Sequence, residues 1–366
     1  MQIDAALFQE NERTAPIVDE RRFMDVGPYV CEPGGELSNV TVAYETWGTL
    51  NADRSNAVLA CHALTGDAHA IGWWDRLIGP GKPIDTDLYF VVGTNALGGC
   101  QGTTGPASSH PDGKPYRLRF PMVTVGDMVE IQSRLLDGLG IQRLLGVAGG
   151  SMGGMQALEW TVRFPERVSK AFITASCAAH SAMQIGFNEA ARQAIMLDPN
   201  WLQGEYPEGA QPVGGLSVSR MIGHLSFLSD AAFTTKFGRR LQDKSNFDYT
   251  LGTEFEVESY LRYQGHKFTN RFDANSLLYV TRAIDYYDLK SLEGSHAEYL
   301  FVSFTTDWLY PSYQSEAMHQ MALRAGCTSQ HAVIDLPYGH DAFLLDGFYQ
   351  GELVRDFLAS SRLGGQ

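Results

Sequence analysis

Ser151 stands at the centre of a G-x-S-x-G pattern, between Gly149 and Gly153. The pattern alone is a weak signal of a nucleophilic serine, because glycine makes up about a tenth of the chain. Its surroundings strengthen the signal: an apolar run at 144–148 precedes it, and apolar residues at helical spacing follow over 155–162. We therefore predict a strand, a tight turn that carries Ser151, and a helix.

Such a turn presents the serine hydroxyl at the N-terminus of the helix. Glycines on both sides avoid collisions with neighbouring elements. The backbone N–H of Met152 then lies where it can hold an oxyanion. The alternative is a glycine-rich turn in which Ser151 only caps the helix. We favour the nucleophile because residues suited to be its acid and base follow it along the chain.

Asp307 and His340 each follow an apolar run, at 299–304 and 332–336 respectively. When a turn of this kind carries the nucleophile, its partners occur in the order Ser, then Asp or Glu, then His. We therefore predict that His340 is the base that takes the proton of Ser151 and returns it to the leaving group. Asp307 is predicted to be the acid that orients this histidine.

His62 also lies beside an apolar run, at 57–61, and resembles a candidate base. It precedes the serine, however, which is the wrong order for this arrangement. We interpret the segment that follows it as a loop that supplies the second oxyanion N–H, from Leu64. Cys61 ends the apolar run and is interpreted as a buried filler rather than a nucleophile.

Strand and helix patterns alternate along most of the chain. The run 40–44 alternates apolar and polar residues, as in a strand open to water on one face. Helical spacing occurs at 128–139 and 155–162, and apolar residues over 343–358 indicate a closing helix. Continuous apolar runs are typical of a parallel sheet covered by helices on both faces, and we predict a doubly wound α/β fold. These runs lie at 57–61, 88–92, 144–148, 168–174, 299–304 and 332–336.

The alternation breaks between residues 179 and 296, where Met, Phe and Tyr occur at helical spacings and no clear strand pattern is present. We interpret this stretch as a helical insertion. In open α/β folds ligands bind at the carboxyl ends of the strands, so an insertion there can form a lid. We expect a core domain of residues 1–178 and 297–366, and a helical lid domain of residues 179–296.

Composition excludes several classes of protein. The chain has 366 residues, 44% of them hydrophobic, which excludes a disordered or collagen-like chain. A net charge of −14 argues against nucleic-acid or anionic-membrane binding. No apolar run approaches the ~20 residues of a membrane helix, and the N-terminal residues lack a signal-peptide pattern. Five scattered cysteines without a C-x-x-C pair fit a cytoplasmic protein with no metal site.

Further sequence blocks make the chain similar to a known family. Besides the serine block at 148–160, they are the segments 43–51, 61–67, 219–224, 307–311 and 339–341. In order and spacing, over nearly the whole chain, these blocks resemble homoserine O-acetyltransferases of the α/β-hydrolase superfamily. The resemblance implies an α/β-hydrolase fold with a helical lid insertion. It also implies transfer of the acetyl group of acetyl-CoA to the hydroxyl of L-homoserine, an entry step to methionine.

The resemblance implies roles for individual residues as well. Ser151 would carry the acyl group in a ping-pong mechanism, with Asp307 and His340 as its acid and base. Arg220 and Asp341 match positions that bind homoserine, since a guanidinium can hold a carboxylate and a carboxylate can bind an ammonium. On residue type alone, Arg220 would be a salt-bridge partner in the lid and Asp341 a helix N-cap. The family also suggests a homodimer.

Other reactions remain open on the sequence. Relatives of this family use succinyl-CoA, whose second carboxylate requires a cation near the acyl group. The residues beside Asp307 offer none, which favours acetyl-CoA, although a basic residue of the lid such as Arg192 would change this. Serine as acceptor would give a serine O-acetyltransferase, and water would give a carboxylic-ester hydrolase. A non-catalytic binding module is the alternative from a different class.

Overall fold

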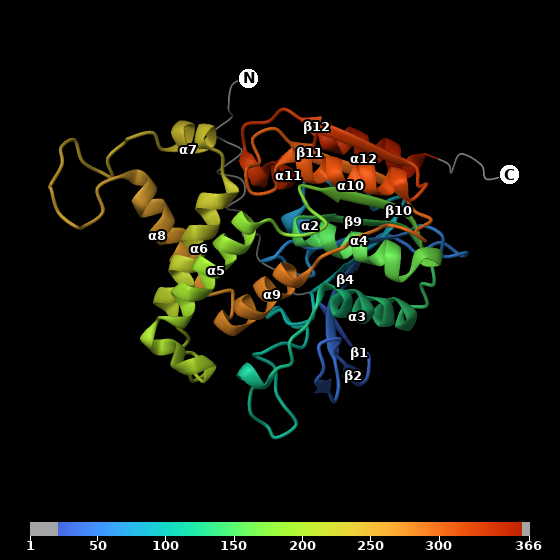
Figure 1. Cartoon of the computed structure of the whole chain (residues 1–366), viewed down its shortest axis with the longest axis horizontal. Helices are drawn as coiled ribbons and strands as arrows, with labels where there is room; N and C mark the ends of the chain where they lie inside the picture. The colour runs from blue at the N-terminus through green and yellow to red at the C-terminus, as the bar shows by residue number, and fades with distance from the viewer. Residues whose placement is uncertain (1–20, 361–366) are drawn as a thin grey trace.

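The computed structural model describes residues 21–360. Its centre is an eight-stranded sheet in the order β1-β4-β8-β5-β9-β10-β11-β12 (Figure 1). β4 runs antiparallel to both of its neighbours, and all pairs from β8 to β12 are parallel. The strands are β1 (Arg22–Asp25), β4 (Thr41–Trp47), β8 (Phe90–Thr94), β5 (Ala57–Cys61), β9 (Leu144–Gly150), β10 (Val168–Thr174), β11 (Glu298–Phe304) and β12 (Ser329–Ile334).

Helices cover both faces of this sheet. Successive residues of the parallel strands enter two separate cores, with Val147 and Ile173 on one face and Ala148 and Phe172 on the other. This explains why the strands are continuously apolar. The first face is covered by α3 (Val125–Gly138), α4 (Met152–Arg163) and α10 (Ser312–Arg324), and the second by α2 (Ala70–Trp73), α11 (Ala342–Leu345) and α12 (Tyr349–Ala359).

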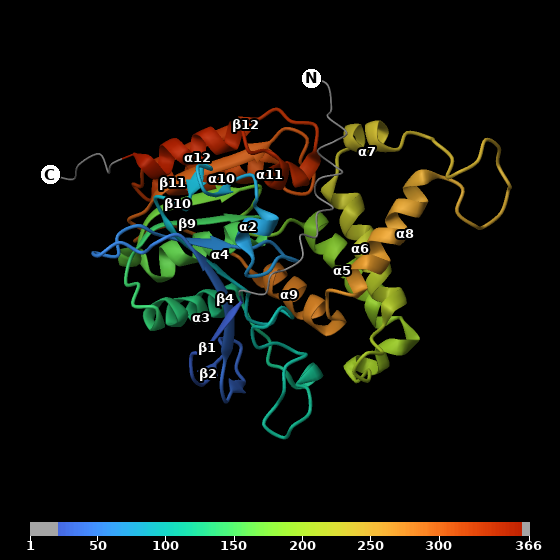
Figure 2. The ribbon, with the colours of Figure 1, turned by 180° about the vertical axis from the view of Figure 1, so that it is seen from behind.

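Between β10 and β11 the chain leaves the sheet and becomes helical. In both views α5, α6 and α8 lie side by side at one end of the molecule (Figures 1 and 2). Ile195, Leu216 and Phe268 belong to a small core of their own. α9 differs, because Tyr279 and Ala283 pack into the core beneath the sheet. The elements are α5 (Ala182–Met196), η3 (Pro199–Gly204), α6 (Val213–Phe227), α7 (Asp230–Lys236), α8 (Glu256–Thr269) and α9 (Ala274–Tyr286).

Two predicted features are wrong in detail. The strand expected to be open to water is β4, whose central residues 42–45 are all buried. It is enclosed because β1 and β8 flank it and the segment around Thr103 packs on it, accepting the N–H of Ala43 at 3.0 Å. The single closing helix is instead two helices, α11 and α12, which residues 346–348 separate; Asp346 follows the end of α11. Its carboxylate accepts backbone N–H groups at the start of α12, so a new helix begins there.

Short elements escaped the sequence patterns because two or three residues are too few to show a period. They are β2 (Tyr29–Val30), β3 (Glu36–Leu37), β6 (Ile78–Gly79), β7 (Ile84–Asp85), η1 (Arg117–Arg119), η2 (Pro165–Arg167) and η4 (Gly339–Asp341). Among residues 21–360, no helix combines the length and apolar character needed to cross a bilayer.

Candidate active site

Ser151 lies in the tight turn between β9 and α4. Its φ and ψ angles are 55° and −125°, a conformation that residues with a side chain rarely adopt. Its N–H donates to the carbonyl oxygens of Thr174 and Ala175, each at 3.1 Å, and Ser176 Oγ donates to its carbonyl oxygen at 2.7 Å. The carboxyl end of β10 therefore holds the strained turn in place.

The glycines of the G-x-S-x-G pattern are required because a side chain at either position would collide with the backbone. A Cβ on Gly149 would lie 2.1 Å from the carbonyl oxygen of Gly153, and a Cβ on Gly153 would lie 2.0 Å from that of Cys61. At Gly150 a Cβ would lie 2.4 Å from the ring of Phe343. Backbone atoms cannot move out of the way by changing rotamer, as a side chain can. The turn can therefore close, and α4 can begin against the end of β5, only if these positions have no Cβ atom.

Asp307 and His340 form a buried hydrogen-bonded pair at the carboxyl ends of β11 and β12. Nδ1 of His340 lies 2.8 Å from Oδ2 of Asp307. The other carboxylate oxygen accepts the N–H groups of Leu309 and Tyr310 at 3.0 and 2.8 Å. Since a carboxylate only accepts, it places the proton of neutral His340 on Nδ1 and leaves Nε2 as a proton acceptor.

Aromatic rings fix the orientation of His340. Tyr310 stacks on it with ring centroids 4.8 Å apart and an interplanar angle of 21°, and Phe343 lies 5.1 Å away. Among residues 21–360, no hydrogen bond joins Ser151 Oγ to Nε2 of His340. Bonds of this kind commonly shorten only when substrate binds. The Ser151 side chain interacts instead with the hydroxyl of Tyr310.

Leu64 and Met152 come from two segments that touch at Gly153. Met152 is the first residue of α4, and Leu64 lies in the loop after β5. Within the described part of the chain, neither backbone N–H has an acceptor. Both groups are thus available to an acceptor, and their role in holding an oxyanion near Ser151 stays a prediction.

His62 has a structural role instead. Its Nε2 accepts the N–H of Ala96 at 3.0 Å, and its Nδ1 lies 2.6 Å from the carbonyl oxygen of Ala63. Burial lowers the pKa of this histidine, which keeps the ring neutral. Both ring nitrogens are therefore used inside the protein, in agreement with its exclusion as the base.

Arg220, on α6, makes no salt bridge within residues 21–360. Its Nη1 lies 3.5 Å from Thr65 Oγ1, and its guanidinium lies over the rings of Phe268 and Phe227, at 4.9 and 5.6 Å. Burial, together with the neighbouring Arg271, lowers the pKa of Arg220 to about 10. The lid salt bridge that the residue type alone suggested does not form in the described chain.

Asp341 follows His340, and its side chain makes no hydrogen bond or ion pair within the described residues. Its side chain makes no capping hydrogen bond to α11, so it is not the N-cap that its position suggested. Burial raises the pKa of its carboxyl to about 6, although the nearby charges of His340 and Arg220 oppose the change. Arg220 and Asp341 thus attract each other without forming an ion pair. Two opposite charges arranged in this way suit the carboxylate and ammonium of an α-amino acid.

Arg192, on α5, is already paired. Its Nη1 lies 2.7 Å from Oδ2 of Asp285 and its Nη2 lies 2.9 Å from Glu189, with only 4% of the arginine side chain exposed. A guanidinium held in this way is not available to the second carboxylate of a succinyl group.

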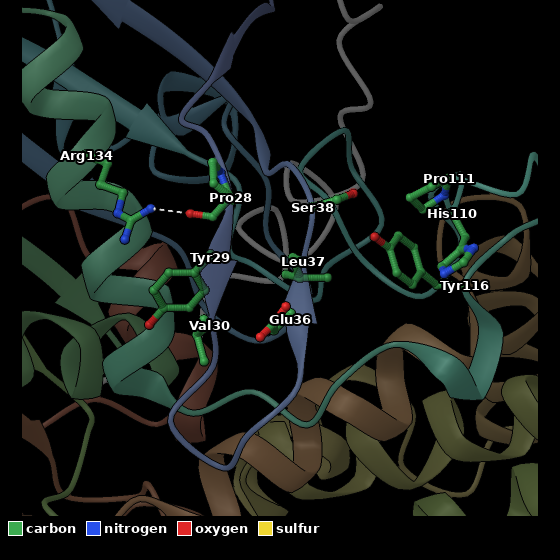
Figure 3. Close-up of a pocket in the computed structure, with 10 residues that line it drawn as sticks. All are labelled: Pro28, Tyr29, Val30, Glu36, Leu37, Ser38, His110, Pro111, Tyr116 and Arg134. Carbon is green, nitrogen blue, oxygen red and sulfur yellow. Dashed lines mark hydrogen bonds between the residues drawn. The ribbon is translucent and has the colours of Figure 1, made fainter.

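The pocket drawn in Figure 3 lies away from these residues. It has a volume of about 500 Å³ and is lined by β2, β3, α3 and the loop at 110–116, with none of the predicted site residues. Two of its polar groups are already paired: Tyr29 donates to Asp127 at 2.6 Å, and Arg134 to the Pro28 carbonyl oxygen at 2.8 Å (Figure 3). Ser38 and His110 also line it, but no hydrogen bond joins them within the described residues, and we do not assign the reaction to this pocket.

The chain is similar to proteins of a known family. A family model described as alpha/beta hydrolase fold matches residues 56–347. The homoserine O-acetyltransferase of Solidesulfovibrio magneticus is 50% identical over 365 residues, which cover 93% of this chain and 92% of that protein. The chain belongs to the homoserine O-acetyltransferase family.

Solved structures agree with this membership. The homoserine O-acetyltransferase from Bacillus anthracis is 30% identical, with a TM-score of 0.87 over 93% of this chain and 98% of that one. Esterase E22 is also 30% identical, with a TM-score of 0.85 over 93% of this chain and 99% of that one. The predicted alpha/beta hydrolase fold and the predicted homoserine O-acetyltransferase family are confirmed. The similarity to an esterase shows that proteins with this fold can use more than one acyl acceptor.

One residue beside Ser151, Tyr310, was not predicted from the sequence. The side chain of Tyr310 contacts Ser151 and His340, and its backbone N–H donates to the carboxylate of Asp307. Its position three residues after Asp307 was visible in the sequence. The direction of its ring and hydroxyl depends on the turn after β11, which no local pattern predicts.

Proposed function

We propose that this chain transfers the acetyl group of acetyl-CoA to the hydroxyl of L-homoserine through an acetyl-Ser151 intermediate. His340 Nε2 takes the Ser151 proton as Oγ attacks the thioester carbon. The N–H groups of Leu64 and Met152 hold the oxyanion, and the C–S bond breaks as His340 returns the proton to the CoA thiolate. Asp307 orients His340 and stabilises its charged form.

The second half-reaction reverses these roles. The homoserine hydroxyl loses its proton to His340 and attacks the carbonyl carbon of the acetyl group. The bond to Ser151 Oγ then breaks and the serine recovers its proton. Water at about 55 M competes for the same intermediate, so the acceptor has to be held in position and water kept out.

The observation that carries the assignment of the acceptor is that neither Arg220 nor Asp341 forms an ion pair within residues 21–360. We infer that Arg220 binds the α-carboxylate and that Asp341 binds the α-ammonium. The family membership supports this reading, because the relatives carry the name homoserine O-acetyltransferase. An ester hydrolase acting on neutral esters would gain nothing from two half-buried charges that have no ion-pair partner in the described residues.

Residues 179–296 act as the lid domain over a core of residues 1–178 and 297–366. Support comes from α6, which brings Arg220 to the site and places the ring of Phe227 6.2 Å from that of His340. Trp308 Nε1 donates to the Leu228 carbonyl oxygen at 3.1 Å and links the acid loop to this segment. A closed lid excludes water during transfer.

Acetyl-CoA is the proposed co-substrate, in preference to succinyl-CoA. The engagement of Arg192 with Asp285 and Glu189 supports this choice, because a dicarboxylic acyl group would need a free cation. The protein holds no permanent cofactor in this proposal.

We also propose a cytoplasmic homodimer whose partners are small-molecule substrates. The free thiols of Cys31, Cys61 and Cys177 are buried and unoxidised, which suits a reducing compartment. Exposed apolar residues on α6, such as Val218 and Leu225, offer surface for a second copy. Sedimentation of the purified protein would give the mass of a monomer if this part is wrong.

Intact-mass measurement tests the mechanism. Incubation with acetyl-CoA should add one acetyl group to the protein, located on Ser151 by peptide mapping, and L-homoserine should remove it. S151A should remain unmodified. An adduct elsewhere, or none, would refute the acetyl-serine pathway.

Thiol release separates the transferase from the hydrolase. CoA release from acetyl-CoA should accelerate strongly when L-homoserine is added, and should be slow with succinyl-CoA or with serine as the acceptor. Equal rates with and without acceptor would make the enzyme a hydrolase, as the similarity to esterase E22 allows.

A further inference from the structure

A second buried Asp–His pair lies next to the catalytic residues. Nδ1 of His180 lies 2.9 Å from Oδ1 of Asp285, and Nε2 of His180 lies 2.8 Å from the hydroxyl of Tyr310. The side chains of His180 and Asp285 are only 2% and 4% exposed. The pair ends on a tyrosine that touches the candidate nucleophile, and the mechanism above gives it no role.

Hydrogen-bond directions in this chain follow from Asp285. Its carboxylate also accepts from Asn188 at 2.7 Å and from Arg192 at 2.7 Å. Burial alone would raise its pKa, but the hydrogen bonds from His180, Asn188 and Arg192 lower it, so the group is ionised. An ionised carboxylate only accepts, and Nδ1 of His180 must donate to it.

The direction then passes to Tyr310. With its proton on Nδ1, a neutral His180 accepts at Nε2, and the Tyr310 hydroxyl must donate there. The lone pairs of the tyrosine oxygen are left facing the site. Tyr310 is also fixed by its ring stacking on His340 and by its N–H, which donates to Asp307 at 2.8 Å. Because the only hydrogen of this hydroxyl is directed to His180, its oxygen presents an acceptor, and not a donor, to Ser151.

We propose that Tyr310 is a positioning residue that orients the Ser151 hydroxyl through an oxygen whose direction is set by His180 and Asp285. In the free enzyme the Ser151 O–H points to this oxygen, which keeps Oγ in one rotamer beside His340. Rotation about the Cβ–Oγ bond then redirects the O–H from Tyr310 to Nε2 of His340 without moving Oγ. This inference rests on the proposed acetyl-serine pathway.

The two half-reactions depend differently on this contact. Acetylation begins with a free Ser151 hydroxyl, which must be in the correct rotamer. Deacetylation begins with an ester, whose Oγ has no hydrogen and whose position is set by the acetyl group. Loss of the tyrosine oxygen should therefore slow the first step and spare the second. A residue that served only to stack on His340 would affect both steps, because His340 acts in both.

The test is Y310F, which keeps the stacked ring and removes the oxygen. We expect single-turnover CoA release from acetyl-CoA to slow by roughly 5- to 10-fold, the range for one hydrogen bond. Discharge of the pre-formed acetyl-enzyme by L-homoserine should stay within about twofold of the wild type. Y287F is the matched control, because the Tyr287 hydroxyl is buried and has no hydrogen-bond partner among residues 21–360. It should leave both rates unchanged.

Two results would overturn the inference. Equal slowing of both half-reactions in Y310F would make the tyrosine a support for His340 alone, and unchanged acetylation would show that its oxygen has no part in orienting Ser151. H180Q provides an independent check. If His180 acts through Tyr310, Ser151 should become acetylated no more slowly in the double variant H180Q/Y310F than in Y310F alone. Failure of the wild type to form acetyl-Ser151 would refute the proposed pathway itself. This outcome can be distinguished from equal slowing of both half-reactions in Y310F, which would refute only the role of the tyrosine oxygen.

Discussion

Replacing Arg220 by methionine should stabilise the fold and impair the second half-reaction. The side chain is similar in length and remains apolar beside Phe268 and Phe227, over which the guanidinium now lies. R220M removes a half-buried charge that has no carboxylate partner among residues 21–360. The enzyme would thus lose a group that, in the proposed function, binds the substrate at a cost to stability.

The magnitude follows from the environment of the guanidinium. Burial lowers the pKa of Arg220 from 12.5 to about 10. At about 1.36 kcal/mol per pKa unit this corresponds to about 3 kcal/mol of disfavoured charge. Contacts of the cation with the faces of Phe268 and Phe227 return about 1–2 kcal/mol. The free energy of unfolding of R220M should therefore rise by about 1 kcal/mol, and at least should not fall.

The loss in activity should be larger and confined to one substrate. Each hydrogen bond to a charged group contributes about 1.5–3 kcal/mol, and a guanidinium can make two to a carboxylate. We expect kcat/KM for L-homoserine to fall by roughly 100-fold or more. Single-turnover acetylation of Ser151 by acetyl-CoA should change little, because the thioester does not need this cation.

Urea unfolding and the thiol-release assay measure both effects on the same preparation. R192M is the matched comparison: Arg192 is paired with Asp285 and Glu189, so its removal should destabilise the protein by about 3–5 kcal/mol. If R220M destabilises the fold as R192M does, Arg220 has a structural partner and the reasoning is refuted. An equal loss in acetylation and in transfer would show that it does not act on the acceptor.

Other changes probe the remaining contacts. The pKa of Asp341 is raised to about 6, so kcat/KM for L-homoserine should fall as the pH drops through 6 and the carboxylate gains a proton; in D341N this limb should vanish from the pH profile. The same shift means that the charged carboxylate destabilises the fold above pH 6, a cost that disappears as the pH falls, so thermal melts at pH 7 should show D341N at least as stable as the wild type. Lys170 is buried and its Nζ donates to the carbonyl oxygens of Phe357 and Leu358 near the end of α12, so K170M should lower the free energy of unfolding by about 1–3 kcal/mol in urea without changing kcat. In G153A the new Cβ would lie 2.0 Å from a backbone oxygen and would push apart the segments that carry the N–H groups of Leu64 and Met152. Steady-state kcat should therefore fall by roughly 100-fold. A G153A enzyme with normal kcat would contradict the placement of the oxyanion hole.

Much of the fold was predictable because its signals are local. The parallel strands are buried on both faces, so β5, β9 and β10 are continuously apolar and can be recognised without knowledge of their neighbours. The turn at Ser151 was predictable for a similar reason, since its backbone conformation and close contacts require glycines within two residues of the serine. The burial of β4 and the break at Asp346 were not, because both result from the packing of distant segments.

The candidate site divides in the same way. By itself the sequence determined the order of Ser151, Asp307 and His340 and the strands that carry the last two, because chain order and strand ends are one-dimensional properties. Which charges have partners was decided only by the tertiary structure. The contact of Arg192 with Asp285 spans 93 residues and that of His180 with Tyr310 spans 130.

Residue type cannot distinguish Arg192, which is paired with carboxylates, from Arg220, which has no carboxylate partner within residues 21–360, since both are arginines on helices of the same segment. Only the folded chain pairs one of them and leaves the other free for the proposed contact with the substrate carboxylate. The physical reason is that the free energy of a buried charge depends on what lies within a few ångströms in space, and the linear order of residues does not contain that distance.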